Sequence, residues 1–100
     1  MCGIYKIENN LNHHIYIGQS VNILDRWRHH KTRAFNKSDA SYNSSLYKAF
    51  RKYGLENFSF QIVEECDRNS LNERETFWIK YYDAYDNGYN ETEGGNSGSF

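Results

Sequence analysis

Five side chains in this 100-residue sequence have the types and spacing that could carry out chemistry on a phosphate. They are two tyrosines with ten residues between them, an arginine and a histidine at helical spacing, and one glutamate: Tyr5, Tyr16, Arg26, His30 and Glu75. Cleavage of a phosphodiester needs a base, a cation beside the developing negative charge and a metal ion. No single residue indicates such a site, but together the five could provide the base, the cation and a ligand for the metal ion.

Glu75 is the most informative of the five because of its place on a predicted helix. On a wheel of about 100° per residue, Leu71, Trp78 and Tyr82 define the buried arc, and Glu75 falls about 40° from its centre. A carboxylate facing a core is costly unless it is paired or binds a metal. We therefore expect a salt bridge to a neighbour such as Arg74, a position at the rim of the core, or a ligand for Mg²⁺.

The other four residues also have structural alternatives. Arg26, His30 and Arg33 follow one another at helical spacing and form a polar stripe, which could simply be solvated. In a site, Arg26 would bind a phosphate oxygen and His30 would exchange a proton. Tyr5 and Tyr16 are either half-buried aromatic residues of strands or phenols of the same site.

Three strands and three helices are expected to position these residues. Residues 2–8 and 13–18 predict strands, and a hairpin symmetric about residues 10 and 11 would place Tyr5 opposite Tyr16. Helices are expected over residues 23–35, from Ser44 or Ser45 to Tyr53 before Gly54, and from a capping box of Ser70 and Glu73 to Tyr82, with a strand over 58–62 between the last two. The fold class is α+β, with a small, mainly antiparallel three-stranded sheet flanked by three helices in the order β-β-α-α-β-α.

The net charge of −1 hides a division along the chain. Residues 21–54 hold eight Lys or Arg and two acidic residues, a net charge of +6, whereas the remainder carries −7. This basic stretch is either a solvated surface or a nucleic-acid contact. Its candidate DNA-binding residues are Arg28, Lys31, Arg33, Lys48, Arg51 and Lys52.

Other classes are disfavoured by composition. Cys2 and Cys66 predict reduced thiols, and the adjacent pairs of histidines do not have the spacing of a helical zinc site. No apolar run reaches the roughly 18 residues of a membrane span, and the N-terminus lacks the apolar region of a secretory signal. We therefore expect a protein without a membrane partner.

Four motifs in order resemble the GIY-YIG nuclease family, above all its phage and intron-encoded homing endonuclease branch. They are Gly3-Ile4-Tyr5 with Tyr16-Ile17-Gly18, then Arg26-Trp27 with His30, then Arg74-Glu75-Thr76-Phe77-Trp78-Ile79, and finally Asn87-Gly88-Tyr89-Asn90. The resemblance implies hydrolysis of DNA with one divalent ion, Mg²⁺ or Mn²⁺, in the cytoplasm of a phage-infected or bacterial host cell. The alternatives are a non-catalytic nucleic-acid-binding module on the same fold and a repair or restriction nuclease.

The resemblance also implies roles for the residues that match the motifs. Tyr5 would act as general base, Tyr16 would position water or share its proton, and Arg26 would stabilise the pentacovalent phosphate. Tyr5 would need a neighbouring positive charge or a proton acceptor such as His30, and Glu75 would hold the metal ion. Asn90 would order the tail or touch the site.

The sequence departs from the family pattern in two ways, one in a candidate site residue and one in length. Some homing relatives have a second histidine between the first two helices, where this chain has Ser41-Tyr42-Asn43-Ser44, so that role is absent or partly taken by Asn43. Residues 1–93 are expected to form the nuclease domain, and residues 94–100 a flexible tail or the start of a linker. A separate or missing DNA-binding domain is therefore expected.

Overall fold

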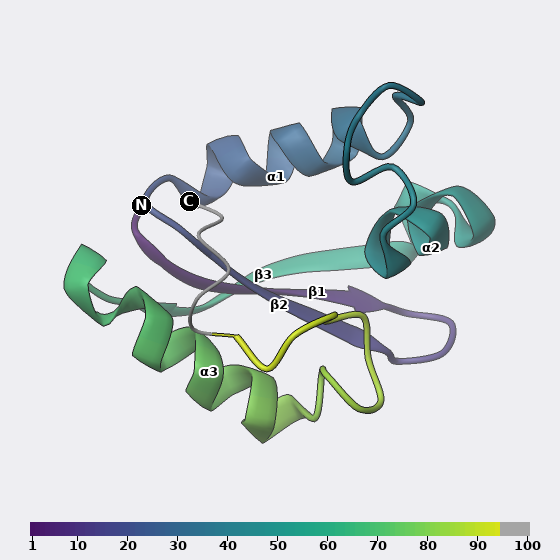
Figure 1. The fold of residues 1–100 in the computed structure, drawn as a ribbon. Coiled ribbons are helices and arrows are strands. Elements are labelled where there is room, and N and C mark those ends of the chain that lie inside the picture. The colour runs from purple at the N-terminus through teal and green to yellow at the C-terminus, as the bar shows by residue number, and fades with distance from the viewer. Residues whose placement is uncertain (95–100) are drawn as a thin grey trace.

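The computed structural model describes residues 1–94, which form a three-stranded antiparallel sheet with helices on both faces (Figure 1). The prediction of an α+β fold in the order β-β-α-α-β-α is confirmed. Two short 3₁₀ turns, Leu55–Asn57 and Arg68–Ser70, precede β3 and α3. The six main elements are β1 (Gly3–Asn9), β2 (Ile15–Ser20), α1 (Ile23–Arg33), α2 (Ser45–Tyr53), β3 (Phe58–Glu65) and α3 (Leu71–Tyr82).

Strand β1 is central, and its alternating side chains build two cores. The strand order is β2-β1-β3, so that β2 and β3 are the edges. Tyr5 and Ile7 pack with residues of α1 and α2 on one face, whereas Ile4 packs with Ile17 and with Leu71 of α3 on the other. The sheet therefore separates α1 from α3, and a side chain of α1 can approach a side chain of α3 only past an edge strand.

The pairing of β1 with β2 differs from the symmetric hairpin, which was wrong by two residues. Tyr5 lies opposite Gly18, and Ile7 lies opposite Tyr16. The loop between the two strands contains His13 in a left-handed conformation, with φ of 64°. A slip of two residues keeps each side chain on its face, so the two phenols still share a face, with ring centroids 6.3 Å apart.

The packing of the Tyr5 ring explains why the residue opposite it on β2 is a glycine, Gly18. A Cβ atom at this position would lie 2.4 Å from both Cζ and Oη of Tyr5. The tyrosine ring thus packs directly over the glycine, and its hydroxyl reaches Nε2 of His30 on α1.

The helix caps agree with those predicted from the sequence, with one exception. The Asn22 side chain accepts a hydrogen bond from the Asp25 N–H, and Gly54 ends α2 with φ of 88°. The capping box at Ser70 is wrong, since α3 has no side-chain cap bond within the described residues. Instead, the Asp67 carboxylate accepts from the Ser70 N–H at 3.0 Å and caps the preceding 3₁₀ turn. The third strand also continues beyond its predicted end, to Glu65.

The segment after α3 returns to the free edge of the sheet. The Tyr89 N–H donates to the Ile15 carbonyl at 2.9 Å, and the Asn90 side chain bonds both the N–H and the carbonyl of Ile17 at 2.8 Å. Asn90 therefore orders this segment along β2. The predicted tail over residues 94–100 lies outside the described residues apart from Gly94. No helix within residues 1–94 is long and apolar enough to cross a membrane.

Candidate active site

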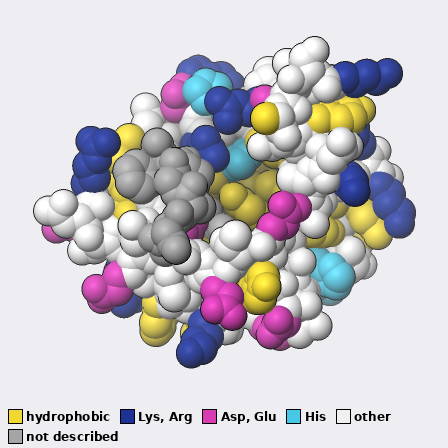
Figure 2. Space-filling model, in the orientation of Figure 1, with side chains coloured by type: hydrophobic (Ala, Val, Ile, Leu, Met, Phe, Trp, Pro, Cys, Tyr) yellow, Lys and Arg dark blue, Asp and Glu magenta, His cyan; other side chains and the backbone are white. Residues whose placement is uncertain are grey.

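A cavity of about 270 Å³ lies beside the edge strand β2. Figure 2 shows a hollow on this face, with an apolar floor and with cationic and histidine side chains at its upper rim. Helix α1 contributes to the cavity from one face of the sheet, α3 from the other, and α2 and the returning C-terminal segment close its sides. Its lining includes most of the predicted site residues: Tyr16, Arg26, His30, Glu75 and Asn90.

Tyr5 is the exception, because it lies behind this wall. Its side chain is 0% exposed, and the described lining of the cavity leaves it out. Its hydroxyl is 2.7 Å from Nε2 of His30, which does line the cavity. Tyr5 is therefore connected to the cavity through its contact with His30.

His30 is a neutral imidazole at neutral pH. It is 3% exposed, and burial together with the positive charges of Arg26 and Arg33 lowers its pKa to about 3. Its second nitrogen, Nδ1, lies 2.8 Å from the hydroxyl of Tyr47. Each ring nitrogen thus has one phenol partner, and a neutral imidazole can donate at one and accept at the other.

Both tyrosines of the predicted site are protonated at neutral pH in this structure. Burial raises the pKa of Tyr5 well above its usual value, and Arg26 only partly opposes the shift. Burial and the negative charge of Glu75 raise the pKa of Tyr16 to about 12. Neither phenol is a resting phenolate, so each can accept a proton only while it passes its own proton on.

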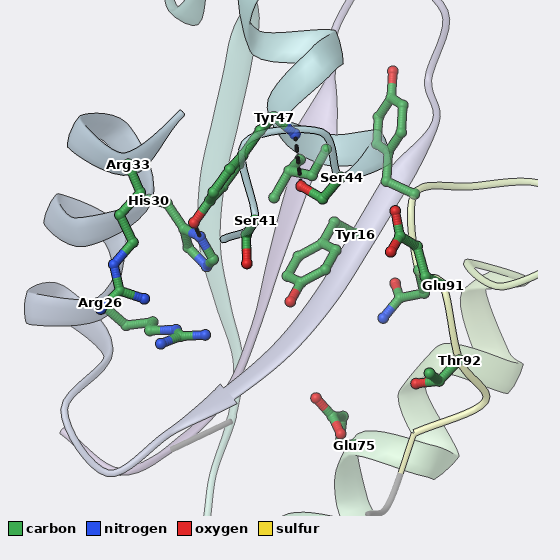
Figure 3. A pocket seen from close by; sticks show the side chains of 13 residues that line it. Tyr16, Arg26, His30, Arg33, Ser41, Ser44, Tyr47, Glu75, Glu91 and Thr92 are labelled. Atoms are coloured by element: carbon green, nitrogen blue, oxygen red, sulfur yellow. Dashed lines mark hydrogen bonds between the residues drawn. The ribbon is translucent and has the colours of Figure 1, made fainter. Parts of the chain in front are cut away.

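Arg26 and Glu75 point into the cavity from opposite sides, with the Tyr16 hydroxyl between them (Figure 3). Nε of Arg26 is buried without a hydrogen-bond partner among residues 1–94. A buried donor left unsatisfied costs about 1–3 kcal/mol. The terminal guanidinium of Arg26 does face the cavity, where it could bind a phosphate oxygen.

The predicted burial of Glu75 is confirmed, since its side chain is 4% exposed. Nε2 of Gln19 donates to Oε1 of Glu75 at 3.0 Å and to Oδ1 of Asn72 at 2.8 Å. Arg74, the neighbour expected as an ion-pair partner, places its Nε 2.7 Å from Oε1 of Glu64. Gln19 thus orients the carboxylate in the cavity wall.

The donor set fits a metal ion that keeps most of its water. Within the described part of the chain, no group of three or more His, Cys, Asp or Glu side chains could hold a metal. Mg²⁺ commonly binds through one or two carboxylates and completes its shell with water and substrate phosphates. Glu75 can provide one such carboxylate to an ion of this kind.

Sequence reasoning missed Gln19 and Tyr47. Gln19 shares its face of β2 with buried Ile17, so a polar residue at an apolar position was the available signal. Tyr47 lies beside the predicted apolar stripe of α2, and nothing in that stripe indicates its bond to His30. Asn43, the suggested substitute for a second histidine, is exposed and is not among the described residues that line the cavity.

The predicted DNA-binding residues divide into three groups. Arg33 lines the cavity. Arg51 instead donates to the Ala34 carbonyl at 2.5 Å and lies 3.7 Å from the ring centroid of Tyr42, which joins α2 to the loop after α1. The exposed members on α1 and α2 are Arg28, Lys31, Lys48 and Lys52. Phosphate contacts by these residues stay a prediction.

The fold and the cavity define a small α+β domain with the GIY-YIG arrangement of two strand tyrosines, a helical Arg–His pair and a buried glutamate. The family of GIY-YIG catalytic domains matches residues 1–90, and the chain belongs to this family.

Named relatives and solved structures agree with this family. Intron-associated endonuclease 1 of Enterobacteria phage T4 is 37% identical over 92 residues, which cover 88% of this chain and 36% of that protein. Probable intron-encoded endonuclease 1 of Neurospora crassa is 35% identical over 95 residues, covering 88% of this chain and 29% of that protein. This chain thus spans about a third of the length of these relatives.

The structural matches extend over nearly the whole chain. The catalytic domain of homing endonuclease I-TevI has a TM-score of 0.80 at 33% identity, covering 92% of this chain and 99% of that chain. A mutant of the same catalytic domain has a TM-score of 0.82 at 33% identity, with coverage of 93% and 95%. The prediction of a homing endonuclease-like catalytic domain is confirmed at the level of family and fold.

Proposed function

We propose that this domain hydrolyses phosphodiester bonds of DNA with one bound divalent ion, Mg²⁺ or Mn²⁺. The observation that carries this proposal is the placement of Arg26 and Glu75 on opposite sides of one cavity, with the Tyr16 hydroxyl between them. A cation and a metal-binding carboxylate flank the position where a phosphate would sit. The names of the relatives, which are endonucleases, support the same chemistry.

Glu75 would hold the ion, with Gln19 fixing the carboxylate. When bound, the ion supplies Lewis-acid stabilisation of charge on the phosphate and on the leaving 3′ oxygen. Arg26 binds a non-bridging phosphate oxygen through guanidinium donors and neutralises the charge that develops as water attacks.

The tyrosines and His30 move the proton of the attacking water. Tyr16 lines the cavity, and its ring centroid is 6.3 Å from that of Tyr5, so its hydroxyl would hold the water and take up its proton. Tyr16 would pass its own proton to Tyr5 as the proton of Tyr5 passes to Nε2 of His30, 2.7 Å away. This coupled transfer removes the need for a phenolate, which the raised pKa values of both tyrosines exclude at neutral pH. Asn90 keeps the C-terminal segment at the cavity through its bonds to β2.

A nicking assay on supercoiled plasmid tests the proposal, with Mg²⁺, Mn²⁺ or EDTA. We expect metal-dependent nicking by the wild type and a loss of about 100-fold or more in Glu75→Ala and Arg26→Ala. The matched control is Glu73→Ala, which removes an exposed carboxylate two residues away on α3. Circular dichroism verifies that each variant keeps the fold.

Three outcomes would count against parts of the proposal. Full activity in Glu75→Ala would reject the metal assignment. DNA binding without cleavage in any divalent ion would favour the non-catalytic binding module. Tyr5→Phe keeps the ring and removes the hydroxyl, so an unchanged turnover would leave Tyr5 with a role in packing alone.

A further inference from the structure

Three buried side chains from three elements form one hydrogen-bonded chain. The Tyr5 hydroxyl on β1 is 2.7 Å from Nε2 of His30 on α1, and Nδ1 of His30 is 2.8 Å from the Tyr47 hydroxyl on α2. Tyr47 is 4% exposed and lines the cavity, where its side chain reaches His30 from the side of α2 (Figure 3). The chain therefore runs from the buried base to the cavity.

The donors and acceptors along this chain set its direction. Arg26 lies close enough to Tyr5 for its positive charge to act on the Tyr5 oxygen, where it opposes the effect of burial on the pKa of Tyr5. This charge favours an arrangement in which the lone pairs of the Tyr5 oxygen face Arg26 and its proton is donated to Nε2 of His30, 2.7 Å away. Since a neutral imidazole carries one proton, that proton is on Nδ1 and is donated to the Tyr47 oxygen. The Tyr47 hydroxyl proton is then available to the cavity.

We propose that Tyr47 completes a proton relay that runs from Tyr5 through His30 to the cavity, and that it holds His30 in the Nδ1–H tautomer. This inference rests on the proposed function. A proton from Tyr16 forms a new Tyr5 O–H bond as the original one breaks and Nε2–H forms, and Nδ1–H breaks as a new Tyr47 O–H forms. The original Tyr47 proton goes to water in the cavity. No electrons are exchanged, and His30 is neutral before and after.

The surroundings of His30 explain why the relay needs an exit. Without Tyr47, a proton accepted from Tyr5 would leave a buried imidazolium close to the positive charges of Arg26 and Arg33. The pKa of about 3 shows how strongly burial and these charges disfavour that cation. With Tyr47, one proton enters at Nε2 as another leaves at Nδ1. Tyr47 acts through His30 and is a positioning residue for the proton transfer.

The test combines ¹⁵N NMR of the His30 ring with single-turnover cleavage, for wild type and Tyr47→Phe. We expect wild-type protein to carry the proton on Nδ1, with Nε2 unprotonated. Tyr47→Phe removes the acceptor of Nδ1–H, so the tautomer should shift toward Nε2–H. The cleavage rate should fall about 100-fold, with DNA affinity unchanged within about twofold. The control is Tyr53→Phe, on the same helix and outside the cavity, which should match wild type in both measurements.

The NMR spectrum of the resting wild-type protein judges the hydrogen-bond chain without any variant or substrate. A proton on Nε2 in that spectrum would overturn the proposal, as would a wild-type cleavage rate in Tyr47→Phe. The failure of the proposed function is distinguishable, because it would be a lack of metal-dependent cleavage by the wild type itself.

Discussion

The neutral state of His30 makes a quantitative prediction about acid stability. Burial and the charges of Arg26 and Arg33 lower the folded-state pKa to about 3, whereas an unfolded histidine titrates near about 6.5. Between these values the unfolded chain binds the extra proton, so stability is full above about pH 6.5 and is lost as the pH falls toward 3. From about pH 6.5 to pH 4, the shift converts to about 3 kcal/mol at roughly 1.4 kcal/mol per pH unit.

Urea unfolding of wild type and His30→Gln at pH 7, 5.5 and 4 measures this contribution. Glutamine can donate and accept hydrogen bonds but does not titrate, so its fixed effect on stability is the same at each pH. We expect the wild type to lose about 3 kcal/mol more than the variant between pH 7 and pH 4. Carboxylates titrate alike in both proteins and cancel in the difference.

His29→Gln is the matched control, because His29 is the exposed neighbour on the same helix. Its pH dependence should follow that of wild type. Parallel stability curves for wild type and His30→Gln would refute the reasoning, since they would mean that burial of His30 does not exclude its proton.

Other predictions concern contacts around the cavity. Gln19→Leu removes the donor to Glu75, so half-maximal cleavage should need about tenfold more Mg²⁺; an unchanged metal titration would contradict this role. Asn90→Ala removes two hydrogen bonds to β2 and should lower the free energy of unfolding by about 1–3 kcal/mol in urea, whereas equal stability would show that these bonds contribute nothing net. Gly18→Ala brings a Cβ to 2.4 Å from the Tyr5 hydroxyl and should cost about 1–3 kcal/mol, seen as a lower Tm by circular dichroism; a Tm equal to that of wild type would count against this packing.

The elements were predictable because their signals are local. The apolar spacing on α3 identified both the helix and the buried position of Glu75, since a helical wheel needs only the residues of one helix. The shared face of Tyr5 and Tyr16 was also correct, although the register was not. The pleat repeats every two residues, so a slip of two leaves each phenol on its face.

The partners within the site were not predictable, because they join elements that are distant in sequence. Gln19 reaches Glu75 across 56 positions, and Tyr47 reaches His30 across 17. No local periodicity encodes such a pair. The register of the hairpin has the same character, since it depends on how two strands pair across a loop. Chemical types were thus predictable, and their hydrogen-bond partners were not.

The division of charge along the sequence has a physical counterpart across the cavity. Helix α1 brings Arg26 and Arg33 to one side, and α3 and the C-terminal segment bring Glu75 and Glu91 to the other. A phosphate would be attracted by the first side and repelled by the second, at distances where Coulomb energies in a partly buried site are several kcal/mol. A divalent ion on Glu75 would reverse the sign of that second side. Under the proposed function, the acidic remainder is therefore compatible with DNA binding, and ion and phosphate should each favour the binding of the other.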